Sequence, residues 1–316
     1  MKKNISVLTP FEDEYKIKLN AVAANCVVAY GENEEALGNA HIVIGNPPLN
    51  LLAGMKCLEW LQLASSGTEP YSKRGVLKDG VILSNVTGAF GDAISEHMVA
   101  AVSMLYKKLH LYRDNQLRHS WSDMGEVKRI EGSVVVAAGL GDIGGGFAKR
   151  MKALGCYIIG IRRANTDKPG YADELYLSDK LDSVLPRADI VALALPNTAH
   201  TAGLFGRERI AKMKDGAVLL NVGRGSAVDT EALCDAAESG KLWGAALDVT
   251  DPEPLPEDHR MWNIKNILVT PHISGYFHMR KTYENIVGMC IDNVRRYLNG
   301  EELLYLVDPE TGYRKL

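Results

Sequence analysis

Short apolar segments alternate with amphipathic segments along most of the chain. The apolar segments have the length of strands, and several, such as SVVVAA and DIVALAL, are apolar on both faces, which is typical of parallel strands covered by helices on each side. Strands alternating with helices in this way predict an α/β protein with doubly wound parallel sheets. The predicted strands are 4–8, 26–30, 41–44, 60–64, 81–84, 133–138, 157–161, 189–195, 217–221, 244–248 and 267–270.

Two long amphipathic segments predict helices that divide the chain. Residues 91–118 carry apolar side chains three and four positions apart, which predicts one continuous apolar stripe through Ile94, Met98, Val102, Leu105, Leu109 and Tyr112. Residues 279–299 form the second helix and end at Asn299-Gly300, a favourable helix C-terminus. We expect these helices to connect two domains, one discontinuous and made of 1–100 and 286–316, the other inserted and made of 101–285.

The segment VVVAAGLGDIGGGFAKRMKALGCYIIGIRR contains a strand, a glycine turn, a helix and a second strand, in that order. Gly139, Gly141 and Gly144 satisfy the pattern GxGxxG, in which the first glycine allows a tight turn, the second lets the backbone approach a pyrophosphate, and the third lets the helix pack on the strand. The N–H groups at the helix N-terminus then favour the diphosphate anion. Because a strand and a helix flank the glycines, the segment predicts a dinucleotide-binding domain.

Two arginines stand where NAD-binding domains usually carry an acid. That acid, near the end of the second strand, accepts hydrogen bonds from the ribose hydroxyls of NAD. Here the first acid after Gly155 is Asp167, which lies beyond the strand in a polar loop, and Arg162 and Arg163 take its place. An arginine can pair with a 2′-phosphate, so we expect NADP(H) to be favoured over NAD(H). The alternative is that both arginines are solvent-exposed charges at a strand end.

Three segments downstream, NVGRGSAVD, ALDVTDPEPLP and VTPHISG, each follow a predicted strand, and ligands bind at the carboxyl ends of parallel strands. They offer Arg224, Glu253 and His272. A histidine can donate the proton that accompanies hydride transfer to a carbonyl, a carboxylate can hold its ring, and an arginine can bind a substrate carboxylate through two hydrogen bonds. Asp251 is the alternative partner for His272, but the prolines on both sides of Glu253 fix its backbone and favour it.

These motifs, in this order and spacing, resemble the D-isomer-specific 2-hydroxyacid dehydrogenase family, which includes glyoxylate and hydroxypyruvate reductases. The resemblance covers essentially the whole chain and rests on GLGDIG, LPNTAHTAGLF, LLNVGRGSAVD, ALDVTDPEPLP, TPHISG and SNVTGAFGDAISEH. It implies a Rossmann-type nucleotide domain inserted into a flavodoxin-like substrate domain. It also implies that Arg224 binds the substrate carboxylate and keto oxygen, that His272 is the acid/base, and that Glu253 is its partner.

The resemblance extends to the binding residues. Ser66 and Gly67, in ASSGTE, match the turn whose backbone N–H groups hold the substrate carboxylate in the family. Asp248 matches an aspartate near the nicotinamide amide, and Pro196 and Thr201 match a loop beside the cofactor ribose. The complete set expected to bind the cofactor is Gly139, Gly141, Asp142, Ile143, Gly144, Arg162, Arg163, Pro196, Thr201, Val222, Asp248, His272 and Gly275.

We therefore expect reduction of a small 2-oxoacid to a D-2-hydroxyacid, and the reverse reaction, by an NAD(P)-dependent enzyme without a metal. An alternative is a non-catalytic, nucleotide-sensing binding protein on the same scaffold, similar to corepressors of the family, because such relatives keep a triad of this kind. Formate-oxidising relatives carry glutamine where Glu253 stands, which counts against that branch. Tyr71, Tyr276 and Phe277 are expected either to line the oxoacid pocket or to pack internally.

Composition narrows the possible partners. A net charge of −3 argues against a general nucleic-acid or anionic-membrane binder. The first apolar run is too short for a signal peptide, and no apolar stretch reaches the roughly eighteen residues that span a bilayer. Five scattered cysteines without a CxxC pair are typical of reduced thiols in a cytosolic protein. We expect a cytoplasmic protein that binds its small-molecule substrate and, from the family resemblance, forms a homodimer.

Overall fold

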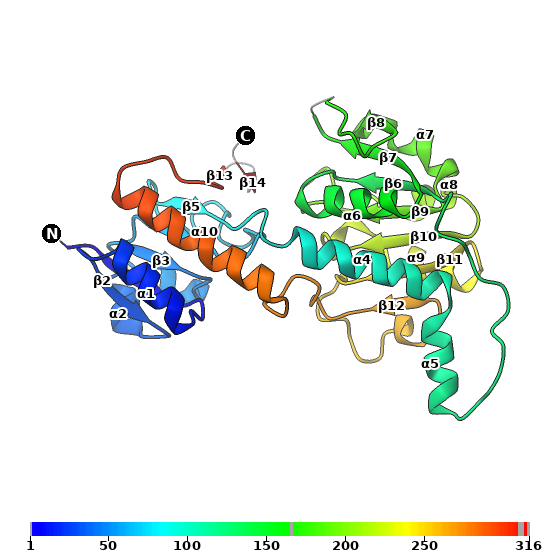
Figure 1. Ribbon diagram of the computed structural model, residues 1–316, viewed down its shortest axis with the longest axis horizontal. Helices are drawn as coiled ribbons and strands as arrows, with labels where there is room; N and C mark the ends of the chain where they lie inside the picture. The colour runs from blue at the N-terminus through cyan, green and yellow to red at the C-terminus, as the bar shows by residue number, and fades with distance from the viewer. Residues whose placement is uncertain (1, 165–166, 309–312, 315–316) are drawn as a thin grey trace. The chain divides into compact units, whose positions relative to one another are not determined.

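The computed structural model describes residues 2–164, 167–308 and 313–314. The chain forms two compact units (Figure 1): unit 1 is Met1–Phe90 with Phe277–Leu316, and unit 2 is Gly91–Tyr276. The sequence placed these divisions at 100/101 and 285/286. They fall instead just before the helices α4 and α10, because α4 packs against α6 inside unit 2 and α10 packs against α1 inside unit 1.

Unit 1 contains a parallel sheet with the strand order β2-β1-β3-β4-β5, which is the order of flavodoxin-like folds. Each strand was predicted to within about two residues. A short antiparallel pair, β13 and β14, was not predicted. The strands are β1 (Asn4–Val7), β2 (Val27–Tyr30), β3 (Ile42–Ile44), β4 (Trp60–Gln62), β5 (Ile82–Ser84), β13 (Val307–Asp308) and β14 (Tyr313–Arg314).

Helices cover both faces of the unit 1 sheet. On one face, Leu37 and Leu52 pack with Leu61 in an apolar cluster. On the other face, α1 and α10 pack together, and the rings of Tyr15 and Tyr283 meet edge to face with centroids 5.6 Å apart. The helices are α1 (Asp13–Val22), α2 (Glu34–Gly38), α3 (Leu49–Leu52) and α10 (Arg280–Leu298), of which α10 agrees with the predicted helix 279–299.

Unit 2 contains a larger parallel sheet with the strand order β12-β11-β10-β9-β6-β7-β8. From β6 the order runs outward in both directions, as in the Rossmann fold, so the topological switch point lies between β6 and β9. The edge strand β8 was not predicted. The strands are β6 (Val134–Ala138), β7 (Tyr157–Arg162), β8 (Glu174–Leu177), β9 (Ile190–Leu193), β10 (Ala217–Asn221), β11 (Leu242–Leu247) and β12 (Ile267–Val269).

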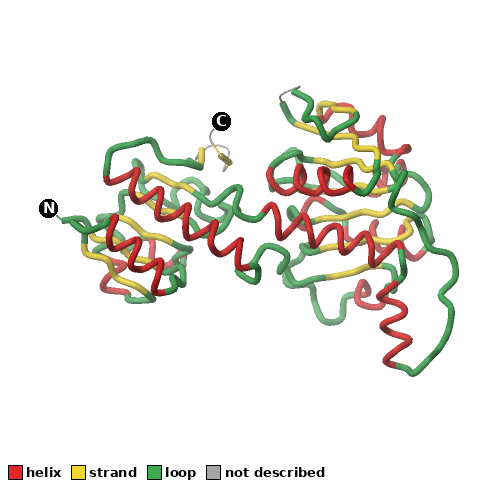
Figure 2. The backbone as a smooth tube through the Cα atoms, in the orientation of Figure 1, coloured by secondary structure: helices red, strands yellow, loops and turns green. Residues whose placement is uncertain are grey.

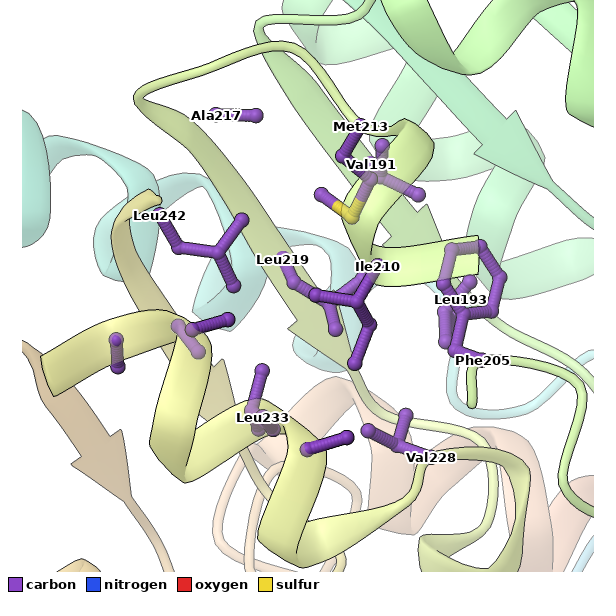
Figure 3. Packing of buried hydrophobic residues seen from close by; sticks show 14 of the residues in the cluster. Val191, Leu193, Phe205, Ile210, Met213, Ala217, Leu219, Val228, Leu233 and Leu242 are labelled. Carbon is purple, nitrogen blue, oxygen red and sulfur yellow. The ribbon is translucent and has the colours of Figure 1, made fainter. Parts of the chain in front are cut away.

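The helices of unit 2 also lie on both faces of its sheet (Figure 2). Figure 3 shows one face, where Leu219 of β10 packs against Ile210 of α8 and Leu233 of α9. On the other face Leu105 of α4 lies close to Gly244 of β11. The α-helices are α4 (Gly91–Tyr106), α5 (Leu109–Leu117), α6 (Asp142–Ala153), α7 (Leu181–Val184), α8 (Arg207–Lys212) and α9 (Thr230–Glu238). The 3₁₀ helices are η1 (Ser178–Lys180), η2 (Leu185–Arg187), η3 (Gly225–Ala227) and η4 (Arg260–Asn263).

The single helix predicted over 91–118 is wrong. The chain leaves the helix after α4, where Lys108 adopts a left-handed backbone conformation with φ 54°, and α5 then begins. No residue of α5 is buried, and Leu109 and Tyr112, which were expected to extend the apolar stripe, are 53% and 36% exposed. The stripe ends at Leu105 because the sheet surface that it covers ends there, and α5 projects from the rest of unit 2 (Figure 1).

No disulfide joins the five cysteines, and three of them, Cys156, Cys234 and Cys290, are buried. Burial raises the pKa of Cys156 and Cys234 to about 11, so both remain thiols at neutral pH. Within the described ranges, no helix is long and apolar enough to cross a membrane.

Candidate active site

The glycine turn after β6 has the geometry that a dinucleotide requires. Gly139 has φ 91°, and a Cβ there would lie 2.7 Å from the carbonyl oxygen of Ala194. A Cβ on Gly144 would lie 1.9 Å from the carbonyl oxygen of Gly139, so helix and turn can pack only without side chains. In the described ranges, a Cβ on Gly141 would meet no atom within 4 Å apart from its chain neighbours and its own helix. The second glycine therefore leaves open space beside its backbone, which is where a pyrophosphate approaches in this motif.

The N-terminus of α6 follows this turn. Gly145 donates its N–H to the carbonyl oxygen of Gly141 at 2.8 Å, so the N–H groups of Asp142 and Ile143 precede the first intrahelical bond. Such groups and the helix dipole attract anions. The carboxylate of Asp142 is turned toward the start of α4, where a Cβ on Gly91 would lie 2.2 Å from its Oδ1. The residues present thus fit a dinucleotide whose diphosphate lies at this helix end.

The two arginines at the end of β7 differ in their surroundings. Arg162 is the last residue of the strand and is half-buried, and its Nη1 donates to the carbonyl oxygen of Asp167 at 3.2 Å. Arg163 follows the strand and is exposed. β7 pairs with β6 and is the second strand of the dinucleotide-binding motif. Both arginines lie at the carboxyl end of β7, and this end of the second strand meets the adenosine ribose in dinucleotide-binding folds.

A threonine closes the loop that follows β9. Thr201 donates its hydroxyl to the carbonyl oxygen of Pro196 at 2.5 Å and accepts the N–H of Thr198 at 2.8 Å. In the next loop, the N–H of Val222 donates to the carbonyl oxygen of Leu193 at 3.1 Å. This last hydrogen bond joins the carboxyl ends of β9 and β10, next to the topological switch point between β6 and β9.

Arg224 stands between two glycines at the carboxyl end of β10. A Cβ on Gly223 would lie 2.3 Å from the carbonyl oxygen of Leu195, and a Cβ on Gly225 would lie 1.9 Å from that of Thr250. The Gly-Arg-Gly segment is thus packed tightly between the loops that follow β9 and β11. This packing fixes the backbone of Arg224, which is half-buried and follows β10, the strand between β9 and β11. Its Nη1 donates to the carbonyl oxygen of Gly223 at 2.8 Å.

His272 and Glu253 form a direct pair. The Nδ1 atom of His272 lies 2.6 Å from Oε1 of Glu253, and the two side chains are 47% and 43% exposed. Glu253 follows β11, His272 follows β12, and Arg224 follows β10, so the three residues come from the ends of three consecutive strands in the sheet. Since Nδ1 faces the carboxylate, Nε2 is the ring atom that can exchange a proton with a substrate.

Asp248 holds the loop that carries His272. It is 2% exposed, and its carboxylate accepts the hydroxyl of Thr270 at 2.5 Å, the N–H of Ile273 at 3.0 Å, and both the N–H, at 3.1 Å, and the hydroxyl of Ser274. His272, between these partners, has a left-handed backbone with φ 52°, a conformation that costs a non-glycine residue about 1–2 kcal/mol. The buried carboxylate therefore stabilises a strained loop, a role that the sequence did not suggest.

Ser66 and Gly67 lie in unit 1, in the turn that follows β4. Ser65 donates its hydroxyl to the carbonyl oxygen of Gly67 at 2.8 Å. Among the residues that the structure describes, the N–H groups of Ser66 and Gly67 have no protein acceptor. Two adjacent N–H groups without acceptors are a site at which a carboxylate can bind.

The sequence leaves open whether Tyr71, Tyr276 and Phe277 line the oxoacid pocket or pack internally. Tyr71 is 7% exposed and donates its hydroxyl to the carbonyl oxygen of Pro47 at 2.9 Å, so it packs inside unit 1. Tyr276 and Phe277 are 56% and 37% exposed. In the described part of the chain, no group of three or more histidine, cysteine or acidic side chains is arranged to hold a metal ion.

Comparison with known proteins identifies the family. Residues 99–274 match the family described as D-isomer specific 2-hydroxyacid dehydrogenase, NAD binding domain. A glyoxylate reductase from Thermofilum pendens is 33% identical over 240 residues, which cover 74% of this chain and 70% of that protein. The crystal structure of a D-isomer specific 2-hydroxyacid dehydrogenase family protein from Aeromonas salmonicida is similar with a TM-score of 0.88 and 29% identity, covering 98% of this chain and 100% of that one.

A second solved structure carries a bound cofactor. It is a D-isomer specific 2-hydroxyacid dehydrogenase from Xanthobacter autotrophicus in complex with NADPH and MES, similar with a TM-score of 0.83 and 25% identity over 99% of this chain and 100% of that one. The family match covers more than half of the chain and includes the glycine turn, Arg224, Glu253 and His272. The chain therefore belongs to the D-isomer-specific 2-hydroxyacid dehydrogenase family and is an NAD(P)-dependent oxidoreductase.

Proposed function

We propose that this protein uses NADPH to reduce a small 2-oxoacid to the D-2-hydroxyacid, and catalyses the reverse reaction with NADP⁺. The observation that carries the proposal is the 2.6 Å contact between His272 and Glu253 at neighbouring strand ends, next to the strand end that carries Arg224. This arrangement supplies a proton donor, a group that orients it, and a cation for a substrate carboxylate. The glyoxylate reductase among the relatives supports a substrate of this class.

Each residue has a defined part in this reaction. When bound, the reduced nicotinamide supplies the hydride to the carbonyl carbon. His272 donates a proton from Nε2 to the carbonyl oxygen, while Glu253 holds the ring through Nδ1. Arg224 binds the carboxylate and polarises the carbonyl. The buried carboxylate of Asp248 keeps His272 in its loop, and the N–H groups of Ser66 and Gly67 bind the substrate carboxylate.

Variants of the catalytic residues test the proposal. His272→Ala removes the proton donor and Arg224→Ala removes the carboxylate-binding cation, so each is expected to lower kcat/KM for the oxoacid by about 10²–10⁴. His259→Ala is the control, because His259 belongs to the same unit but accepts the N–H of Met261 at the start of η4. Wild-type turnover in either catalytic variant would contradict the mechanism.

We also propose that Arg162 or Arg163 binds the 2′-phosphate of NADPH. The support is the absence of an acid at the end of β7 and the position of both arginines at the ribose end of the strand. Hydrogen bonds to charged groups contribute about 1.5–3 kcal/mol, which corresponds to about a ten- to hundredfold change in affinity. Replacing both arginines with alanine is therefore expected to raise the KM for NADPH by that factor and leave the KM for NADH unchanged. Equal changes for both cofactors would make them ordinary surface charges.

We further propose that the chain forms a homodimer through the projecting segment around α5. Leu109, Leu117 and Trp121 expose 53%, 65% and essentially all of their side chains there. Covering these apolar side chains with a second copy of the chain would remove them from water, which is favourable. Molecular mass by light scattering is expected to be that of two chains for the wild type. The Leu117→Glu, Trp121→Ser double variant is expected to have the mass of one chain. A monomeric wild type would contradict this proposal.

A further inference from the structure

Asn85, the residue after β5, uses every polar group it has. It is 2% exposed. Its N–H donates to the carbonyl oxygen of Tyr305 at 3.1 Å, and its own carbonyl oxygen accepts Nε2 of Gln62 at 3.1 Å. Its side-chain Nδ2 donates to the carbonyl oxygen of Ser66 at 2.8 Å, and Oδ1 accepts the N–H of Thr87 at 3.1 Å. A buried residue satisfied at all four groups is held in one position.

Gln62, which donates to the carbonyl oxygen of Asn85, also has hydrogen-bond partners for both atoms of its side-chain amide. Gln62 is fully buried at the end of β4, and its Nε2 also donates to the carbonyl oxygen of Leu63 at 2.9 Å. Its Oε1 accepts the hydroxyl of Ser84 at 2.7 Å and Nδ2 of Asn293, from α10, at 2.8 Å. The ends of β4 and β5 and one face of α10 are therefore joined by one buried polar network.

The segment after α10 completes this network. Asn293 donates Nδ2 to the carbonyl oxygen of Leu304 at 3.0 Å and accepts its N–H at 2.8 Å. The next residue, Tyr305, accepts the N–H of Asn85, and Leu306 pairs antiparallel with Ser84. The position of Asn85 is thus set from two sides, by β4 and by the segment that follows α10.

The side chain of Asn85 fixes the peptide plane between Ser66 and Gly67. A trans peptide is planar, and its carbonyl oxygen and N–H point in opposite directions. Because Nδ2 of Asn85 holds the Ser66 carbonyl oxygen at 2.8 Å, the N–H of Gly67 points away from Asn85. The direction of the Gly67 N–H therefore depends on the side chain of Asn85, which is not part of the turn.

We propose that Asn85 is a positioning residue that aims the Gly67 N–H at the substrate carboxylate; this rests on the proposed role of Ser66 and Gly67. An amide is required because one side chain must donate to the Ser66 carbonyl and accept from the Thr87 N–H. An aspartate would keep the second bond but would place a negative oxygen against the Ser66 carbonyl. The aspartate would also place a negative charge next to the Ser66-Gly67 turn, which is proposed to bind the substrate carboxylate.

Kinetics of Asn85 variants test this inference in the full-length protein. Asn85→Asp and Asn85→Ala are both expected to raise the KM for the oxoacid about tenfold or more, with little change in kcat and in the KM for NADPH. Asn85→Ala removes both side-chain bonds without adding charge, so it serves if the aspartate variant does not fold. The control is Leu37→Ala, which removes a side chain that is 3% exposed in the same unit and belongs to an apolar cluster with Leu52 and Leu61.

Comparison of the Asn85 variants with Leu37→Ala distinguishes a loss of positioning from a loss of stability. Leu37→Ala is expected to lower the melting temperature and to leave the oxoacid KM at the wild-type value. If Leu37→Ala raised that KM as much as the Asn85 variants do, the effect would be general destabilisation and the inference would be overturned. An unchanged KM in both Asn85 variants would overturn it as well.

A second readout does not depend on turnover. In protein labelled with ¹⁵N at glycine, the amide resonance of Gly67 is expected to move in both Asn85 variants and to stay in place in Leu37→Ala. If the wild type turned over no oxoacid, the proposed function would fail, while this resonance would still test the role of Asn85. A Gly67 resonance at the wild-type position in both Asn85 variants would overturn the inference even in an active enzyme.

Discussion

The loop around His272 in unit 2 and the turn around Gly67 in unit 1 follow the same plan with different chemistry. Each follows a parallel strand, and each is held by a buried polar side chain that comes directly after the neighbouring strand. In unit 2 that side chain is the carboxylate of Asp248, and in unit 1 it is the amide of Asn85. We call Asp248 and Asn85 the anchors of these two segments, and both are 2% exposed.

The difference follows from what each segment presents to its anchor. Thr270, Ile273 and Ser274 present only hydroxyl and N–H donors, and a carboxylate accepts from all of them. The turn in unit 1 presents a carbonyl oxygen, which needs a donor. The charge of Asn85 also suits the proposed ligand of its turn, since a neutral amide beside the turn does not repel a bound carboxylate.

The largest effect is expected from removing the charged anchor. Asp248→Asn turns a donor toward the N–H or hydroxyl of Ser274, and an unsatisfied buried donor costs about 1–3 kcal/mol. We expect kcat to fall about a hundredfold or more and the melting temperature to fall by about 2–4 °C for each kcal/mol lost. Stopped-flow turnover and thermal unfolding measure these changes.

The same variant separates two roles of Asp248. A residue that only holds the His272 loop changes kcat and stability, whereas a direct contact with the nicotinamide amide changes the KM for NADPH. Wild-type kcat and melting temperature in Asp248→Asn would show that the loop does not need its anchor, and the comparison between the two anchors would fail.

An intermediate effect is expected from one partner of that anchor. Ser274→Ala removes a hydroxyl that donates to Asp248 but keeps the N–H that also donates to it. One hydrogen bond to a charged group contributes about 1.5–3 kcal/mol, so we expect about a tenfold fall in kcat, smaller than that of Asp248→Asn. In the Asp248→Asn background the same change is expected to add little, because the partners act together. Full additivity would argue against a shared anchor.

The smallest effect is expected from Asn46, which bonds to the two residues before Ser66 in unit 1. Its Oδ1 accepts the N–H of Ala64 at 3.1 Å and its Nδ2 donates to the hydroxyl of Ser65 at 2.9 Å. Unlike Asn85, Asn46 is exposed, so water can replace both bonds. Asn46→Ala is therefore expected to raise the oxoacid KM only about two- to threefold. An effect as large as that of Asn85→Ala would show that burial of the anchor is not what matters.

The fold could be read from the sequence where apolar runs were long enough to be buried. The central strands of both sheets were predicted for this reason. The strand β8 was missed because ELYL lies at the sheet edge with no fully buried residue. The break before α5 was missed because Leu109 and Tyr112 continue the helical spacing, and spacing alone cannot show where the covered surface ends.

The site could be predicted only in part. Motifs indicated Arg224, Glu253 and His272, and the structure brings Glu253 and His272 into contact. Asn85 and Gln62 were missed because polar residues at strand ends look like turn residues in a sequence. Their importance depends on the pairing of Gln62 with Ser84 in the sheet. A weak signal was available, since strand alternation puts Gln62 on the same buried face as Trp60.

The most direct test of the central claim is to follow consumption of NADPH and NADH separately with glyoxylate, hydroxypyruvate, pyruvate and bulkier 2-oxoacids. The proposed function requires oxidation of NADPH by one or more of the small oxoacids, a lower KM for NADPH than for NADH, and loss of the reaction in His272→Ala. Tight nucleotide binding without turnover of any oxoacid would contradict it and favour a nucleotide-sensing protein. Reduction of NAD⁺ or NADP⁺ by formate, without turnover of oxoacids, would contradict it in favour of formate oxidation.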